Sequence, residues 1–477
     1  MMRRLAVLAG GFLIASCNVT EATPPGSTGG TTAFATGGSP ALPMGMPGGA
    51  SSTGGQATGG AVNGGASSGG TVSSGQAGGG AGGATAGASG AATGGAATPP
   101  VVSMVGKPYT FPQNKRSTYC SYPAAVDPNQ AKLAYERWKA ELVTSEGAGD
   151  ALRVRRPANE EDTTVSEGIA YGMILAVTMD DQTTFDQLWK YSQKYLNGNG
   201  LMNWRISASG EVTGGGAATD ADEDMAWALA LADVKWGGMG TLDKPYLELA
   251  KTQIQRIWDH EVVHDWGELL NAGDSWNGAI VFNPSYFAPN QYRLFGKLTD
   301  NVDGWNKVID KGYEIFGKAM RPDFGNVDNG LIAAWTDAEG VPHGPFDGAP
   351  THYQYDSARI PFRIGMDFCE FGEPRAKAYL DKVNAFFSGV GAAQIVDGYD
   401  LNGMPRAENP SAQSALFVGA AGVAAMSDPR FKTLMDDTWT LLVSKEMTPP
   451  SYYYNLSWQV FSLLMMSGNL FDYTQHP

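Results

Sequence analysis

Three acidic residues at predicted helix starts have the side chains needed for acid–base chemistry. Glu167 lies in the segment "SEGIAYGM", residues 166–173, and Asp220 is the first acid of "ATDADEDMAW", residues 218–227. Asp356 lies in "YDSARIPFRIGMD", residues 355–367. A protonated carboxyl can donate a proton to a reacting group and an ionised carboxylate can accept one. We therefore treat Glu167, Asp220 and Asp356 as candidates for one reactive centre.

The acidic cluster that begins at Asp220 is not a calcium loop. Asp220, Asp222 and Asp224 match the first three ligand positions of such a loop. The pattern then requires glycine where Met225 stands and glutamate where Leu231 stands. Both requirements fail, so the sequence predicts no metal site here.

Helix-start chemistry explains most of this cluster. Thr219 or Asp220 can cap a helix N-terminus, and Asp222 and Glu223 then fall in its first turn. Acids in a first turn accept unpaired N–H groups and complement the helix dipole. Asp222, Glu223 and Asp224 therefore receive a structural interpretation, which leaves Asp220 as the candidate for function.

The other two motifs also have structural alternatives. Glu167 could be an ordinary capping glutamate, although the glycines around Tyr171 indicate close approach by another backbone or by a ligand. Asp356 could be a helix-start residue, followed by Arg359 and Arg363 on one helix face.

The elements that must position these residues are mostly helices. Several predicted helices are apolar nearly all round, and such helices are normally buried between others. We therefore predict an all-α fold with an inner layer of buried helices and an outer layer facing water. The helical patterns cover residues 163–179, 220–236, 246–262, 304–320, 357–371, 409–426 and 451–468.

The N-terminal region is typical of a targeting signal followed by a linker. Residues 1–17 have a basic start and a short apolar stretch, which predicts an export signal. Their end, "LIASC", resembles a bacterial lipobox, which implies lipid attachment at Cys17; an ordinary signal peptide is the alternative. Residues 18–100 are rich in Gly, Ala, Ser and Thr and predict a disordered linker, and residues 101–477 predict one folded domain.

Charge and cysteine content limit the partners and the compartment. The net charge of −15 argues against nucleic acid and against an anionic membrane surface, and it suits a neutral or cationic substrate. Contact with a membrane is expected only through the lipid at Cys17, either at the cell surface or in the periplasm; without the lipid, the protein would be secreted. Cys120 and Cys369 form either one disulfide or two buried thiols.

Four segments in this order resemble glycoside hydrolase family 8. They are "TVSEGIAYGM", "ATDADEDMAWALALADVKW", "NPSYFAP" and "YDSARIPFRIG". The second departs from the family pattern only at Ala230, where a larger apolar residue or glycine is usual. The resemblance implies an (α/α)6 barrel and hydrolysis of β-1,4-linked polysaccharide with inversion. By motif, Glu167 is then the general acid, Asp356 the general base, and Asp220 the residue that holds the sugar at the cleavage point.

The resemblance also implies sugar-binding positions. Aromatic rings pack on the C–H faces of sugars, and planar polar groups bind their hydroxyls. The implied positions are Trp204, Trp276, Tyr286, Tyr355 and Arg359. Tyr452, Tyr453 and Tyr454 are further candidates, and the sequence does not show which of them faces the cleft.

The expected partner is a neutral β-1,4-linked polysaccharide, without a cofactor or a metal, and the expected state is a monomer. We favour β-1,4-glucan, with xylan or chitosan as alternatives inside the family. A polysaccharide-binding lipoprotein without activity and a polysaccharide lyase are the alternatives outside it. We also expect Asp220 to lie close to Glu167, because an ionised neighbour would help to keep the general acid protonated.

Overall fold

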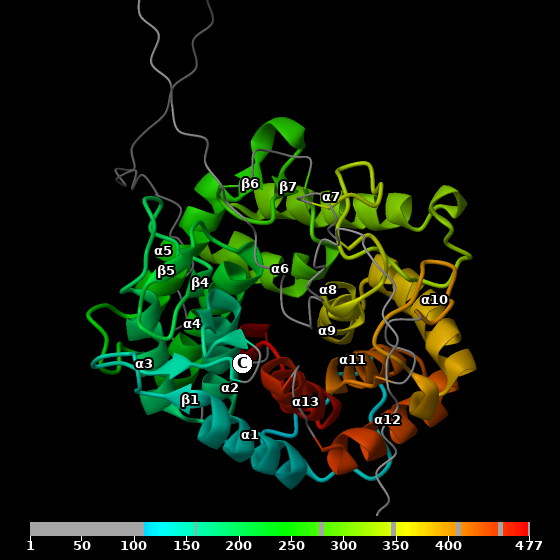
Figure 1. Cartoon of the computed structure of the whole chain (residues 1–477), viewed down its shortest axis with the longest axis horizontal. Coiled ribbons are helices and arrows are strands. Elements are labelled where there is room, and N and C mark those ends of the chain that lie inside the picture. The colour runs from blue at the N-terminus through cyan, green and yellow to red at the C-terminus, as the bar shows by residue number, and fades with distance from the viewer. Residues whose placement is uncertain are drawn as a thin grey trace, which may run out of the picture. The chain divides into compact units, whose positions relative to one another are not determined.

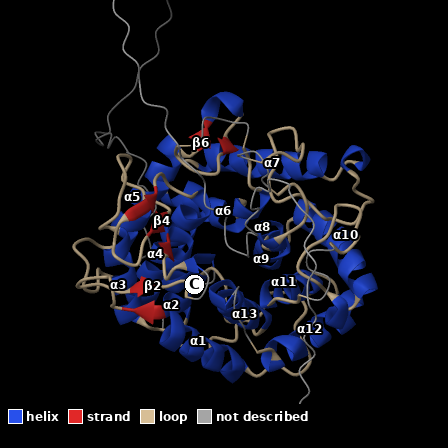
Figure 2. Cartoon of the chain, viewed as in Figure 1, coloured by secondary structure: helices blue, strands red, loops and turns tan. Residues whose placement is uncertain are grey.

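The computed structural model describes residues 109–157, 160–275, 281–344, 350–406, 412–446 and 452–475. The predicted signal peptide, its Cys17, the predicted linker and Trp276 lie outside these residues. The described part is built mainly from helices, as predicted, and its strands are two or three residues long (Figure 2). None of its helices has the length and apolar character needed to cross a bilayer.

Six helical positions form an inner ring in which each contacts its neighbours (Figure 1). Every residue of α2 and of α11 is buried, which explains why their sequences are apolar all round. In chain order the inner helices are α2 (Ser166–Thr178), α4 (Thr219–Trp236), α6 (Pro289–Leu298), α8 (Tyr355–Ala358) continued by α9 (Ile360–Phe371), α11 (Ala415–Ala425) and α13 (Tyr452–Met466).

Six further helices pack outside this ring, each against an inner helix (Figure 1). They are α1 (Pro128–Leu142), α3 (Gln182–Ser192), α5 (Tyr246–His260), α7 (Val302–Ala319), α10 (Pro374–Val390) and α12 (Lys432–Ser444). The two rings together are an (α/α)6 barrel. The sequence patterns miss most of the outer helices because their solvent-facing sides interrupt the apolar runs.

The connections between helices differ strongly at the two ends of the barrel. Five of the connections that enter inner helices are long and comprise residues 143–165, 193–218, 261–288, 320–354 and 391–414, whereas the one into α13 (445–451) and those that leave inner helices, such as 179–181 and 372–373, are shorter. We call the end with the long connections the loop face and the other end the rear face. The strands belong to these long connections: β1 (Val143–Thr144), β2 (Arg153–Val154), β3 (Thr164–Val165), β4 (Arg205–Ile206), β5 (Val212–Gly214), β6 (Val262–Val263) and β7 (Leu269–Leu270). Every inner helix therefore presents its N-terminus to the loop face.

The two ends of the described domain meet at the rear face. Tyr109 stacks on Tyr473 with ring centroids 4.9 Å apart. Gln113 donates a hydrogen bond to the carbonyl of Thr178, the last residue of α2, over 3.1 Å. Both ends of the described domain are thus fixed where the inner helices finish.

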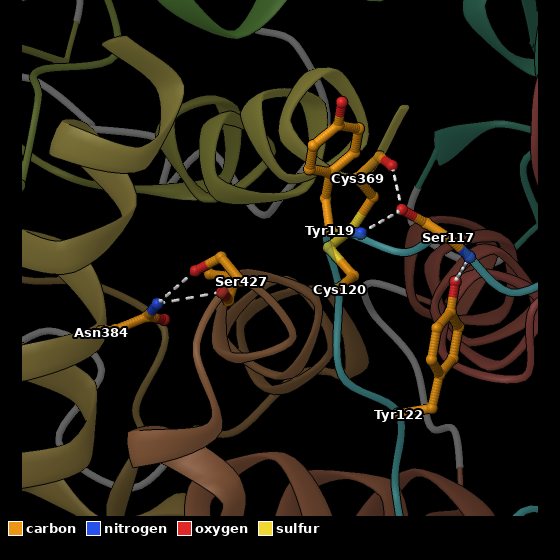
Figure 3. Close-up of a disulfide and its surroundings, with 8 residues drawn as sticks. Ser117, Tyr119, Cys120, Tyr122, Cys369, Asn384 and Ser427 are labelled. Atoms are coloured by element: carbon orange, nitrogen blue, oxygen red, sulfur yellow. Dashed lines mark hydrogen bonds between the residues drawn. A yellow bond between two sulfur atoms is a disulfide. The ribbon is translucent and has the colours of Figure 1, made fainter. Parts of the chain in front are cut away.

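Cys120 and Cys369 form a disulfide between the segment before α1 and helix α9 (Figure 3). Their Cα atoms lie 5.3 Å apart, although 249 positions separate them in the sequence. The Ser117 hydroxyl donates to the Cys369 carbonyl and accepts from the Tyr119 backbone N–H. Of the two states left open by the sequence, the structure has the disulfide.

Candidate active site

One buried guanidinium brings the three predicted acidic residues together. Nη1 of Arg359 donates to Oε2 of Glu167 over 2.6 Å and to Oδ2 of Asp220 over 2.8 Å. Its Nη2 donates to Oδ1 of Asp356 over 2.9 Å. The Arg359 side chain is fully buried, whereas the Glu167 side chain is 11% exposed, against 2% for Asp220 and 5% for Asp356. Glu167 is thus the acid of the three that remains most open to a ligand.

The inner ring explains this convergence. Glu167, Asp220 and Asp356 are each the second residue of an inner helix, in α2, α4 and α8. Helix N-termini favour negative charge, and all three N-termini point to the loop face. Arg359 stands at the break between α8 and α9, where Pro361 occupies the first turn of α9.

The helix-start interpretation of the acidic cluster holds only in part: Asp222 lies in the first turn of α4 as predicted, but neither Thr219 nor Asp220 is the cap. The N-cap of α4 is Ala218, and no side chain caps this helix. All four acids are buried, because α4 is enclosed on every side, so polar groups there need partners on neighbouring helices. Those partners are Gln253 for Asp222, Tyr292 for Glu223, and Arg363 with Gln291 for Asp224.

Of the predicted sugar-binding aromatics, Tyr286 contacts Arg359, and Trp204 lies next to the helix that carries Glu167. The guanidinium of Arg359 lies over the ring of Tyr286, 5.2 Å from its centroid. The backbone carbonyl of Trp204 accepts from the N–H of Ser166, so Trp204 lies beside the start of α2. Its ring fills the space that a side chain at Gly214 would need.

Tyr355 lies farther along the loop face. Its hydroxyl donates to Oδ2 of Asp397 over 2.9 Å, and its ring makes an edge contact with Tyr454. Trp276, the remaining predicted aromatic, lies outside the described residues. Tyr286, Trp204 and Tyr355 thus lie on the connections and helix starts of the loop face, and their contact with sugar stays a prediction.

The comparison with known families identifies this arrangement. The family model "Glycosyl hydrolases family 8" matches residues 111–468. The chain belongs to glycosyl hydrolase family 8. It is therefore an inverting glycoside hydrolase that acts on β-1,4-linked polysaccharide, and its two rings of helices are the barrel that the sequence resemblance implied.

Relatives and solved structures agree with this membership. Endoglucanase A of Acetivibrio thermocellus is 38% identical over 381 residues, which cover 77% of this chain and 75% of that protein. Endoglucanase 2 of Ruminiclostridium josui is 37% identical over 388 residues, which cover 79% and 81%. The apo structure of a β-1,3-1,4-glucanase from Paenibacillus sp. X4 superposes with a TM-score of 0.70 at 28% identity, over 76% of this chain and 99% of that one.

The family 8 site contains polar residues that the sequence analysis did not assign. The Tyr453 hydroxyl donates to Oε1 of Glu167 over 2.9 Å, and Gln354 donates to Oδ2 of Asp356 over 2.8 Å. The Tyr171 hydroxyl accepts a weaker bond from Arg359. Tyr453 was one of three equivalent candidates. Gln354 directly precedes the helix of Asp356, and that adjacency was the available signal.

Burial controls the titration of the Asp220 carboxyl. Its pKa is raised from 3.8 to about 7, first because burial penalises the charged form and then because of the charge of Glu167, while Arg359 acts in the opposite direction. The predicted closeness of Asp220 to Glu167 is therefore present, through the nitrogen they share. The charge of Glu167 thus raises the pKa of Asp220. That Asp220 keeps Glu167 protonated stays a prediction.

A second buried acidic pair lies behind the family 8 centre. Burial raises the pKa of Asp222 and of Glu261 well above the usual range. The charge of Asp222 raises the pKa of Glu261 further, whereas the hydrogen bond between the two side chains acts to lower the pKa of Asp222. Among the described residues, no group of three or more His, Cys, Asp or Glu is arranged to hold a metal ion.

Proposed function

We propose that this family 8 enzyme cleaves β-1,4-glucan chains internally, with Glu167 as general acid, Asp356 as general base and Asp220 as the residue that holds the sugar at the cleavage point. The observation that carries this proposal is the single Arg359 guanidinium that contacts all three carboxyls. Glu167 and Asp356 contact different nitrogens of one guanidinium, over 2.6 and 2.9 Å, so the two carboxyls are bridged and not in direct contact. Inverting enzymes likewise keep their two carboxyls apart, by about 6.5–9.5 Å.

In the proposed mechanism, Glu167 and Asp356 each carry out one step. Glu167 donates its proton to the glycosidic oxygen, and the bond from that oxygen to the anomeric carbon breaks. Asp356 accepts a proton from a water molecule, and the oxygen of that water bonds to the anomeric carbon from the opposite side. The leaving chain gains a hydroxyl and the configuration at the anomeric carbon inverts.

The charges in the site indicate that one of the three carboxyls stays protonated near neutral pH. Three carboxyls converge on one guanidinium in a buried place. Full ionisation would leave two uncompensated charges there, which is costly in a low-dielectric environment. The raised pKa of Asp220 agrees with one carboxyl keeping its proton. We propose that, when a sugar hydroxyl binds to Asp220, the proton is held by Glu167 and no longer by Asp220.

The choice of glucan rests on charge and on the relatives. The chain is acidic, which disfavours polyanionic substrates such as polyuronates. The named relatives are endoglucanases and a β-1,3-1,4-glucanase.

The test is an assay of reducing ends released from soluble β-1,4-glucan, mixed-linkage glucan, xylan and chitosan. We expect the highest rate on a glucan, and a loss of roughly 100- to 10,000-fold in Glu167→Gln and in Asp356→Asn. Glu161→Gln is the matched control, because this acid lies in the connection that leads into α2, six residues before Glu167, but its side chain is 80% exposed. Full activity in either site variant refutes the roles. Products that absorb in the ultraviolet would instead indicate a lyase, and binding without release of reducing ends would indicate a binding protein.

We further propose that the enzyme is exported and lipid-anchored through Cys17, with residues 18–100 as a flexible tether. The lipobox-like end of the first seventeen residues and the composition of the linker support this proposal. Expression in a bacterium fed a labelled fatty acid tests it. We expect label in the wild type and none in Cys17→Ser; equal labelling of both refutes the anchor.

A further inference from the structure

A pocket of about 620 Å³ opens on the loop face, away from the acidic centre. Its walls come from two of the long connections, the one between α7 and α8 and the one between α10 and α11. The side chains that matter for its chemistry are Phe324, Thr351, His352, Asp400, Asn402 and Arg406. A volume of this size lies in the usual range for small-molecule sites.

The pocket is joined to the proposed general base by a short piece of chain. His352 precedes Asp356 by four residues, so their Cα atoms lie within about 14 Å. Between them, Tyr353 and Tyr399 exchange two backbone hydrogen bonds of 3.0 and 2.9 Å. These bonds hold the two walls of the pocket against each other beside the start of α8.

The far wall is a tight hairpin with ordered polar groups. Within residues 398–406, Asp400 donates its N–H to the Met404 carbonyl, and Arg406 donates its N–H to the Gly398 carbonyl. The Arg406 guanidinium pairs with Asp400 over 2.7 Å, and the two side chains remain 28% and 50% exposed. The planar polar groups are therefore held in place while they still face solvent.

This chemistry fits an uncharged sugar better than an ion. Asp400 compensates the charge of Arg406, so the pair offers donors and acceptors with little net charge. Asn402 adds an exposed side-chain amide, and Phe324 adds an aromatic ring. Neighbouring hydroxyls of a pyranose need such paired donors and acceptors, and its C–H face packs on a ring.

We propose that this pocket is an outer subsite that binds a glucosyl unit of the polysaccharide beyond the bond being cleaved, with the Asp400–Arg406 pair as its main polar contact. The proposal rests on the proposed function, because it needs a glucan chain threaded past Asp356. Trp204 lies in the connection before α4, and the pocket lies in the connections before α8 and before α11. The glucan chain would therefore cross the loop face from Trp204 to the pocket.

The experiment uses cello-oligosaccharides of increasing length, from cellotriose to celloheptaose, with kcat/KM measured for each. The test variant is Asp400→Ala/Arg406→Ala, which removes both members of this ion pair. The control is Lys244→Ala/Glu248→Ala, an ion pair with side chains 50% and 52% exposed where α5 begins, at the rear face. Thermal unfolding of each variant reports its folding.

We expect kcat/KM of the wild type to rise with length, and the test variant to lose about tenfold on the longest oligosaccharides, with a smaller loss as the chain shortens. The control should follow the wild type at every length. An equal loss at all lengths, or no loss at any length, overturns the subsite. If the wild type cleaves no β-1,4-glucan, the proposed function fails first, and the subsite fails with it.

Discussion

Asp224 and Arg363 form a two-point ion pair one helical turn away from the contact between Asp220 and Arg359. Asp224 lies four residues after Asp220 on α4, and Arg363, on α9, lies four residues after Arg359. The two inner helices are therefore joined by two successive acid–arginine contacts, of which only the first belongs to the proposed reactive centre. The second pair fixes how α4 and α9 face each other, so it positions Arg359.

Breaking this second pair should lower activity without touching substrate. Arg363→Met leaves Asp224 buried without its partner, and such losses typically cost 3–5 kcal/mol of folding free energy. Asp224→Leu/Arg363→Met removes both charges and should recover most of that stability. We expect kcat of the double variant to stay roughly tenfold or more below the wild type. Recovery of both the unfolding temperature and kcat would show that the pair has a purely structural role.

The titration of Asp220 predicts a pH-dependent stability. Because the folded state holds this proton more tightly than the unfolded chain, the stabilisation is complete below about pH 4 and is lost as the pH rises through about 7. Asp220→Asn carries no proton that titrates in this range. We expect its unfolding temperature to fall less between pH 5 and pH 8 than that of the wild type, while its activity drops severely. Equal falls in both proteins would contradict the raised pKa.

Adjacent tyrosines at the start of α13 offer a matched pair of variants. Tyr453→Phe removes the donor to Glu167, whereas Tyr452→Phe removes a contact to Glu141 on the outer helix α1. We expect about a tenfold loss of kcat for the first and a change within about twofold for the second, since only Tyr453 touches the proposed general acid. Similar kinetics for the two variants would rule out the role of Tyr453.

The disulfide should contribute stability rather than catalysis. It closes a long loop and fastens the segment before α1 to α9, so Cys120→Ser/Cys369→Ser should lose about 2–5 kcal/mol of unfolding free energy. Activity well below the new unfolding temperature should match the wild type, because neither cysteine contacts the acidic centre. Denaturant unfolding and initial rates measure the two effects, and a large loss of kcat at low temperature would contradict this separation.

The sequence predicts the acidic centre well, since Glu167, Asp220 and Asp356 each mark the start of a buried helix. It does not predict which tyrosine contacts Glu167, because successive residues on a helix point about 100° apart and only packing selects among them. It also does not predict that Asp222, Glu223 and Asp224 pair with side chains on neighbouring helices. Acids at a helix start suit capping and tertiary pairing equally, and only the burial of α4 on all sides decides between the two.

The sequence likewise predicts one part of the fold and misses another. Inner helices such as α11 are recognisable because every residue is buried, whereas the outer helices show only a narrower apolar stripe. The pair of Asp224 with Arg363 was not foreseen. A spacing of four residues on each of two distant segments becomes a contact only when the relative position of the helices is known.

The stacking of Tyr109 on Tyr473 has a geometric consequence. Whatever precedes Tyr109 joins the domain at the rear face, while the acidic centre and its neighbouring pocket open on the loop face. Attachment and catalytic opening are therefore at opposite poles. A tether at the N-terminus would hold the enzyme by its rear face. The loop face would then point outward, toward insoluble polysaccharide fibres that are too large to reorient themselves.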